Sequence, residues 1–220
     1  MKIIKHYLKT KKQEALMLSL LTLFCCALLL IRAKTSQSIF FFFLIWNLFL
    51  GGIPYFIAQF LKLSIKFQEN KWLRISTLLV WLLFLPNSFY ILTDFFHLNK
   101  FNSVPVWYDL LVVATFSITG FLFGLYSLFT IQKILTIHHS KNLSRIIVFL
   151  SVYLTAFGIY LGRYLRFNSW DVITNPIDLF TNLFSSLFST EVQQFTIGFG
   201  TFLFVIYFVA ATLTFKNQNT

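Results

Sequence analysis

The sequence predicts an all-α polytopic membrane protein, with a bundle of about six transmembrane helices and one amphipathic helix at the outer interface. Of the 220 residues, 57% are hydrophobic and 11% are charged, whereas soluble domains hold about 45–50% apolar and about 25% charged residues. Six apolar windows are long enough to cross a hydrocarbon core of about 30 Å. Since no linker is long enough to separate two domains, we expect a single integral membrane domain over residues 1–220.

The six predicted spans are separated by short polar or basic segments. They cover approximately residues 15–31, 39–61, 75–92, 110–131, 146–162 and 195–215. The first window follows a basic stretch, as a signal peptide does, but Arg32 and Lys34 follow it where a cleavage site would need small residues. We therefore expect it to be a retained signal anchor.

Lysine and arginine are distributed unevenly between alternate connections. With six spans and a cytoplasmic N-terminus, the cytoplasmic segments hold 13 of these residues and the outer segments hold 5. Because basic residues favour the cytoplasmic side, this distribution predicts that both termini are cytoplasmic, with the protein in the plasma membrane. The net charge of +11 is then a topology signal. The charges form no single basic face, so a nucleic-acid partner is not expected.

The longest outer connection carries a helical pattern over approximately residues 176–190. Its apolar residues recur at helical spacing, and Asn175 and Pro176 are helix start signals. These apolar residues are Ile177, Phe180, Leu183, Phe184, Leu187 and Phe188. Such a helix either lies flat in the outer interface or packs on the protein, and the sequence leaves both alternatives open.

The third span ends in an unusually polar stretch, "LPNSFYILTDFFHL". In a helix, Asn87, Asp94 and His97 would form one polar stripe that reaches the outer end of the span. Pro86 removes a backbone hydrogen bond and predicts a kink at the start of that stripe. Because polar side chains at membrane depth usually face the bundle interior or a wet cavity, the stripe indicates an internal site.

Two further polar segments belong to the same side of the membrane. The segment "VPVWYDLL" places Asp109 near the N-terminal end of the fourth span, where the helix dipole stabilises a carboxylate by about 0.3–1 kcal/mol. The segment "GRYLRFNSWDVITNP" closes the fifth span. It contains Arg163, Arg166, Asn168, Ser169, Trp170 and Asp171. Because the connections are short, we expect the three segments to form one pocket.

These residue types suggest acid–base chemistry on an anionic substrate. His97 would act as a general base oriented by Asp94, with Asp109 and Asp171 as further catalytic acids. Arginine binds phosphate or carboxylate at two points. The substrate-binding candidates are Asn87, Arg163, Arg166, Asn168 and Trp170. A divalent metal on His97 and Asp94 is an alternative, but a zinc site needs three or four ligands, and we assign no metal.

A structural role is the other alternative, in which acids pair with arginines to fasten helix ends. The sequence contains no nucleophile elbow, P-loop or dinucleotide fingerprint, and it identifies no cofactor or protein partner. Two classes of function remain. One is a membrane enzyme acting on a lipid or lipid-linked envelope molecule within the lipid bilayer. The other is a binding or transport module, or a subunit of a membrane complex.

The combination of "WLLFLPNSFYILTDFFHL", "WYDLL" and "GRYLRFNSWDVITNP" is similar to the motifs of the DUF1361 family, a group of bacterial multi-pass membrane proteins without an assigned function. The resemblance extends from about Leu73 to Phe215. It implies a multi-pass fold in a bacterial membrane, with the polar residues above at the positions of the family motifs. It implies no activity or cofactor, because the family offers none to carry over.

Overall fold

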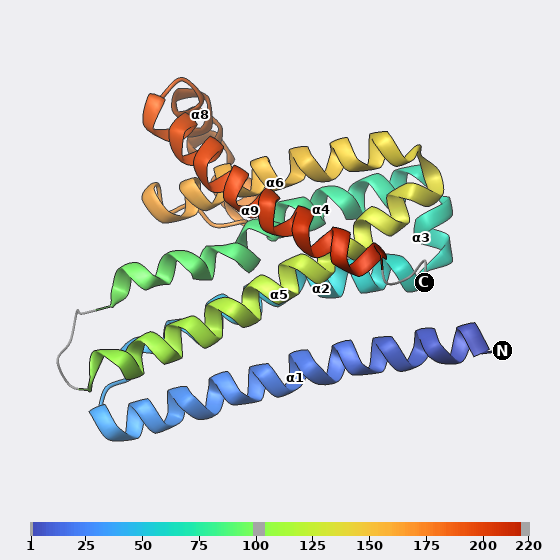
Figure 1. Ribbon diagram of the computed structural model, residues 1–220. Coiled ribbons are helices and arrows are strands. Elements are labelled where there is room, and N and C mark those ends of the chain that lie inside the picture. Colours follow the sequence, from blue (N-terminus) through green and yellow to red (C-terminus); the bar gives the residue numbers. More distant parts are fainter. Residues whose placement is uncertain (1, 99–103, 217–220) are drawn as a thin grey trace.

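A computed structural model describes the backbone of residues 2–98 and 104–216 and the side chains of residues 12–98 and 104–214. All regular structure in these ranges is helical (Figure 1). Six helices are long and apolar enough to cross a membrane. They are α1 (Lys2–Ser36), α2 (Phe43–Leu63), α4 (Lys71–Tyr90), α5 (Val106–His138), α6 (Lys141–Tyr164) and α9 (Thr190–Lys216). Each predicted window overlaps one of them, so the predicted all-α, six-helix multi-pass fold is confirmed.

Short helices occupy the connections. These are η1 (Phe40–Phe42), α3 (Ile65–Glu69), η2 (Ile91–His97), α7 (Asp171–Thr174) and α8 (Pro176–Leu187). Side-chain caps help to define where the spans begin. The Asn70 side chain accepts hydrogen bonds from the backbone N–H groups of Trp72 and Leu73, and Ser140 accepts one from Leu143. Such caps satisfy donors that have no partner inside the helix.

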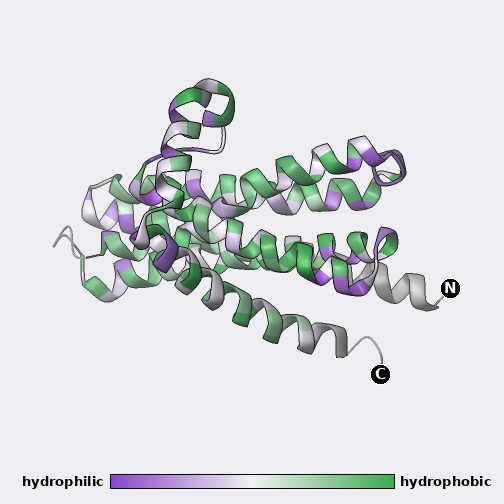
Figure 2. Ribbon diagram, turned by 90° about the horizontal axis from the view of Figure 1, so that it is seen from above, coloured by the Kyte–Doolittle hydropathy of each residue, from purple (hydrophilic) through white to green (hydrophobic). Residues whose placement is uncertain are grey.

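The long helices run in alternate directions, so the start of α1 and the end of α9 lie at the same end of the bundle (Figure 1). The opposite end carries η1, η2, α7 and α8, and we call it the site end. Apolar residues cover much of the middle of the long helices, and polar residues gather toward their ends (Figure 2). This distribution is the one that a surrounding bilayer requires.

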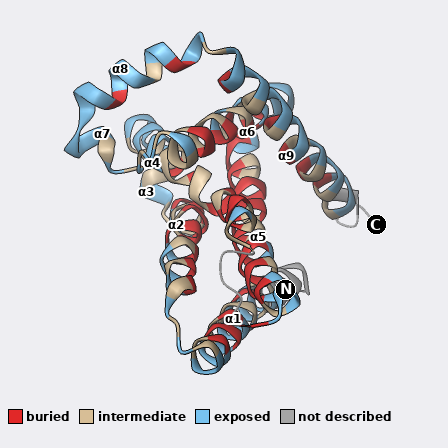
Figure 3. Ribbon diagram, turned by 90° about the vertical axis from the view of Figure 1, so that its left-hand side faces the viewer, coloured by how far each residue is buried: buried red, intermediate tan, exposed pale blue. Residues whose placement is uncertain are grey.

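Helix α5 is the centre of the bundle (Figure 3). In its most apolar window 61% of the residues are buried, against 22% for α1 and α9. One side of α5 packs with α4, α6 and α9 around Leu85, Leu128 and Ile159. Another side packs with α1 and α2 around Leu44 and Phe116. Helices α1 and α9 are therefore peripheral, and α4 is held between α5 and its neighbours.

Glycines allow the part of α4 that follows Pro86 to approach its neighbours closely. A Cβ atom at Gly120 of α5 would lie 2.6 Å from Cδ1 of Ile91 and 2.9 Å from the carbonyl oxygen of Ser88. A Cβ atom at Gly158 of α6 would lie 2.6 Å from Cγ of Pro86. Small residues at helix interfaces let backbones meet in membranes. This close packing, at the "GFLFG" segment of α5 and at Gly158 of α6, positions the part of the chain that leads to the site.

We expect Gly120→Ala to lower the thermal stability of the purified protein. The new methyl group would press on the Ser88 backbone, and overpacking of this kind costs about 1–3 kcal/mol. Gly198→Ala is the matched control, because a Cβ there meets nothing within 4 Å and alanine favours the helix by up to about 1 kcal/mol. The two unfolding temperatures are compared in the same detergent. A Gly120→Ala protein as stable as Gly198→Ala would contradict the close approach.

Helix α8 matches the amphipathic segment predicted over residues 176–190, and it begins at Pro176 as the start signals indicate. It stands apart from the long helices at the site end (Figures 1 and 3). Ile177, Phe180 and Phe184 are exposed, while Leu179 is buried toward the bundle. The helix is thus apolar on its outward side as well, which suits a place in the membrane interface.

Candidate functional site

A buried carboxylate lies in η2, directly after the end of α4. Asp94 is only 1% exposed. The Nδ2 atom of Asn47 donates to Oδ2 of Asp94 at 2.9 Å, and Nη1 of Arg163 lies 3.7 Å from Oδ1. A charge removed from water costs several kcal/mol unless its partners compensate. The amide from α2 and the guanidinium from α6 are the two compensating groups for this carboxylate.

Arg163 joins Asp94 to His97. Its Nη1 atom lies 3.1 Å from Nε2 of His97, and its Cζ atom lies 5.3 Å from the ring centroid of Phe96. A guanidinium only donates hydrogen bonds, so Nε2 is the acceptor and the imidazole proton is on Nδ1. The structure thus brings three of the predicted site residues together. We call Asn47, Asp94, His97 and Arg163 the charged cluster.

Aromatic rings enclose the imidazole on its other side. The ring centroids of Phe43 and Phe40 lie 5.2 Å and 6.2 Å from that of His97, both in edge-on geometry. These rings come from η1 and the start of α2. They shield His97 and leave it half-buried. Fixing the imidazole between rings and a guanidinium orients it, as a general base or a ligand-binding group requires.

A second polar link fastens the segment after α6 to α4. The Nδ2 atom of Asn87 donates to Oγ of Ser169 at 2.9 Å and to the carbonyl oxygen of Phe84 at 3.0 Å. The Ser169 hydroxyl donates in turn to the carbonyl oxygen of Leu83 at 2.9 Å. These bonds satisfy backbone and side-chain groups in the turn that Pro86 interrupts. Asn87 therefore has a positioning role in this structure.

Asp171 and Trp170 shape the same segment. Asp171 accepts from the backbone N–H of Asn168 at 2.6 Å and from the Thr174 hydroxyl at 3.0 Å, which stabilises the first turn of α7. The Trp170 ring lies 6.5 Å from the Trp46 ring of α2. The Asp171 carboxylate is thus engaged in local hydrogen bonds at the start of α7.

Arg166 and Asn168 are exposed polar residues of this segment. Arg166 adopts a left-handed backbone conformation, with φ of 62°. That conformation disfavours residues other than glycine by about 1–2 kcal/mol. It turns the chain sharply between the end of α6 and Ser169. The Arg166 cation therefore stays at the surface of the site end, while Arg163 points inward.

Asp109 forms an ion pair with an arginine of α1. Nε of Arg32 lies 3.0 Å from Oδ1 of Asp109 and Nη2 lies 3.4 Å from Oδ2, which gives a two-point ion pair between α1 and α5. Arg32 is 0% exposed and Asp109 is 4% exposed. The Arg32 Cζ atom also lies 4.5 Å from the Phe41 ring centroid. Here Asp109 fastens α1 to the bundle, as the structural alternative supposed.

Two residues of this region were missed by sequence reasoning as site members. Asn47 lies in the second predicted span, where a lone amide in an apolar window signals an internal partner. Arg32 was counted as a connection charge. Among the described residues, no group of three or more histidine, cysteine, aspartate or glutamate side chains is arranged to share a metal ion.

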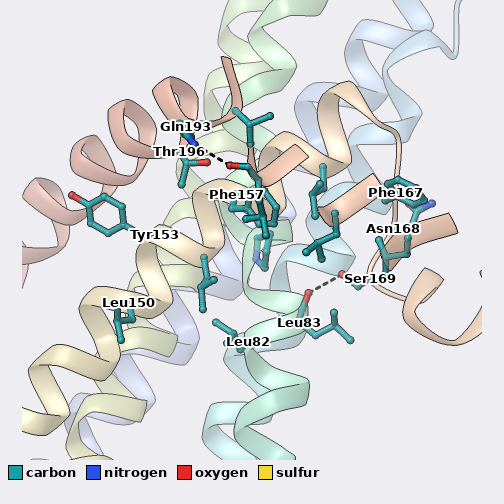
Figure 4. A pocket seen from close by; sticks show the side chains of 18 of the residues that line it. Leu82, Leu83, Leu150, Tyr153, Phe157, Phe167, Asn168, Ser169, Gln193 and Thr196 are labelled. Carbon is teal, nitrogen blue, oxygen red and sulfur yellow. Dashed lines mark hydrogen bonds between the residues drawn. The ribbon is translucent and has the colours of Figure 1, made fainter. Parts of the chain in front are cut away.

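An apolar groove of about 840 Å³ lies between α4, α6, α8 and α9 (Figure 4). Residues of α4, α6, α8 and α9 line it, and most of them are leucines or aromatic residues. Polar side chains are confined to Asn168, Ser169, Gln193 and Thr196, with a tyrosine, Tyr153, on α6. Ser169 belongs both to the groove and to the link with Asn87. The segment from Arg163 to Ser169 therefore contributes to the cluster and to the groove.

The profile of the family described as "Protein of unknown function (DUF1361)" matches residues 46–207. The chain belongs to this family. The family resemblance read from the three motifs is thus confirmed. No protein of curated function and no solved structure matches the chain. In this DUF1361 protein the charged cluster and the groove lie within the matched residues, whereas Arg32 lies outside them.

Proposed function

We propose that this DUF1361 protein is a membrane enzyme that acts on a lipid or lipid-linked molecule of the cell envelope. The observation that carries the proposal is that the segment from Arg163 to Ser169 contributes both to the Asp94–Arg163–His97 cluster and to a large apolar groove. Ionisable groups within apolar spans are costly, and they typically mark substrate or ion sites. The polar head group of an amphiphile would suit the charged cluster, and its hydrocarbon part would suit the groove.

The contacts of Arg163 support a specific order of events. A phosphate or carboxylate head group would draw the guanidinium into a two-point interaction. That movement would release Nε2 of His97, whose lone pair could then accept a proton from the substrate or from water. Asp94 would hold the Arg163 cation near the site throughout. Binding of the anion and exposure of the base are thereby coupled.

A binding or transport module is the second candidate, and one observation favours it. His97 Nε2 already accepts a hydrogen bond from Arg163, so the base is occupied in this arrangement. A module that only recognises an anion needs the guanidinium and not a free base. The two candidates share the amphiphilic ligand and differ in whether that ligand is chemically changed.

We further propose that the site end faces the outside of the plasma membrane and that both termini are cytoplasmic. In a background with Cys25 and Cys26 replaced by alanine, a cysteine at the exposed Asn175 should react with a membrane-impermeant maleimide. A cysteine at Glu69, at the opposite end, should be spared until the membrane is opened. The reverse labelling pattern would refute this orientation.

Untargeted analysis of lipids and envelope precursors in a deletion strain tests the proposed function. We expect an amphiphile with an anionic head group to accumulate in that strain and to return to the parental level when the wild-type gene is restored. An unchanged lipid and precursor profile, in conditions in which the parent makes the protein, would count against both a lipid-directed enzyme and a lipid transporter.

A further inference from the structure

We infer that the groove between α4, α6, α8 and α9 binds one acyl chain of a lipid from the membrane leaflet at the site end. If the proposed function holds, this acyl chain is the apolar half of the substrate, and to that extent the inference rests on the proposed function. Binding of the acyl chain in the groove does not itself depend on catalysis.

The length of the groove matches one leaflet. On α6 its lining extends from Leu150 to Leu161, a distance of about 16 Å at 1.5 Å per residue. The hydrocarbon core of a bilayer is about 30 Å thick, so the groove covers about half of it. Its polar end, at Asn168 and Ser169, lies at the site end, where lipid head groups would be. An acyl chain of one leaflet has this length and this polarity.

The groove has a volume of about 840 Å³. A flexible chain can fill a narrow groove of this size, which lies within the usual range of about 300–1,000 Å³ for small-molecule sites.

One polar atom in the groove lacks a protein partner. The Thr196 hydroxyl is buried and makes no hydrogen bond among the described residues. Other helical threonines of this chain donate to the preceding turn, as Thr212 does to the carbonyl oxygen of Phe208 at 2.8 Å. Thr196 lies next to Gln193 on the α9 side of the groove (Figure 4). A buried hydroxyl without a partner is costly, and rotation of the side chain toward the groove would let the ester carbonyl of a lipid accept its hydrogen bond.

Helix α8 requires hydrocarbon on two sides. Leu179, Leu183 and Leu187 line the groove, while Phe180 and Phe184 are exposed on the helix. A surface helix of a soluble protein would carry polar residues on its outward side. An acyl chain beneath α8 and the membrane around it satisfy both sides of the helix.

Photo-crosslinking tests this inference directly. The probe is a phosphatidylglycerol with a diazirine at the end of one acyl chain, added in trace amount to vesicles of phosphatidylethanolamine and phosphatidylglycerol that contain the purified protein. We expect wild-type crosslinks to concentrate near Leu79 and Leu150. Leu154→Trp fills the groove and should reduce them at least fivefold. Leu213→Trp makes the same change at an exposed position of α9 outside the groove and should not.

Thr196→Val removes the hydroxyl and keeps the shape of the side chain. We expect crosslinking in the groove to fall about fivefold, the equivalent of one hydrogen bond. We also expect the delipidated variant to be as stable as wild type or more stable, because a buried unpaired hydroxyl has been removed. Equal groove crosslinking in wild type, Leu154→Trp and Thr196→Val would overturn the inference. So would dissociation of an oligomer by Leu154→Trp with unchanged crosslinking, which would indicate a protein occupant.

The same probe separates this inference from the proposed function. His97→Gln should keep normal crosslinking in the groove. If His97→Gln also complemented the deletion strain fully, the enzyme proposal would fail and the acyl-chain site would stand. If wild type showed no crosslinks in the groove while His97→Gln lost function, the acyl-chain site would fail and the enzyme proposal would stand.

Discussion

His97→Gln is expected to lower activity by about 100-fold or more while the protein accumulates to its normal level. The amide oxygen of the introduced glutamine could still accept a hydrogen bond from Arg163, so the packing of the site should survive. An amide cannot take up and release a proton near neutral pH, and a general base contributes about 10²–10⁴-fold to a rate. The measurement is complementation of the deletion strain, normalised to the amount of protein in the membrane.

Two further variants make that result specific. His139→Gln is the matched control, because His139 is exposed at the opposite end of the bundle. It should complement fully. Asp94→Asn removes the negative charge next to Arg163 and should behave like His97→Gln. Full complementation by both His97→Gln and Asp94→Asn would end the catalytic proposal and leave the binding or structural role.

Arg32→Met is expected to destabilise the protein by about 3–5 kcal/mol, because it leaves the Asp109 carboxylate buried without its cation. Methionine keeps most of the apolar stem, so the main loss is electrostatic. We expect a lower unfolding temperature and a lower amount of protein in the membrane. An Arg32→Met protein as stable as wild type would contradict the buried ion pair.

The double variant Arg32→Met/Asp109→Leu then shows whether Asp109 has only a structural role or also a catalytic one. Replacing both members of a buried ion pair by apolar residues is often neutral or stabilising. We expect the double variant to recover both stability and complementation, because Asp109 joins α1 to α5 in this structure. A stable double variant that fails to complement would return Asp109 to the catalytic role that the sequence suggested.

The spans and the core of the site could be predicted because the bilayer imposes strong rules on a sequence. Apolar windows must be about 20 residues long, and alternate connections must lie on opposite sides. Those rules place the ends of three spans at one side of the membrane. Within so small a bundle, Asp94, His97 and Arg163 had few other partners than one another.

The partners of Arg32 and Asp171 could not be predicted in the same way. An arginine after a span looks the same in sequence whether its side chain reaches the interface or turns inward. The carboxylate that Arg32 binds is 77 residues away in the chain. Aspartate occurs both at helix starts and in functional sites, so the sequence does not separate the two roles. Only the hydrogen bonds of Asp171 with Asn168 and Thr174 show its local role.

The groove was not predicted because hydrophobic periodicity does not distinguish a groove-lining leucine from one that faces lipid. Leu154 and Leu213 have similar exposure, 52% and 63%, yet only Leu154 lines the groove. The difference arises from where α8 and α9 lie relative to α4 and α6. That arrangement depends on connections whose geometry, including the turn at Arg166, leaves no clear periodic signal in the sequence.

The most direct measurement follows the fate of the molecule that accumulates in the deletion strain. This amphiphile would be purified and incubated with wild-type or His97→Gln protein in lipid nanodiscs, and its mass would be recorded over time. A membrane enzyme that uses His97 as its base should change the mass of the amphiphile only with the wild-type protein. An unchanged mass with wild-type protein that nevertheless binds the amphiphile would contradict the enzyme and support the binding or transport module.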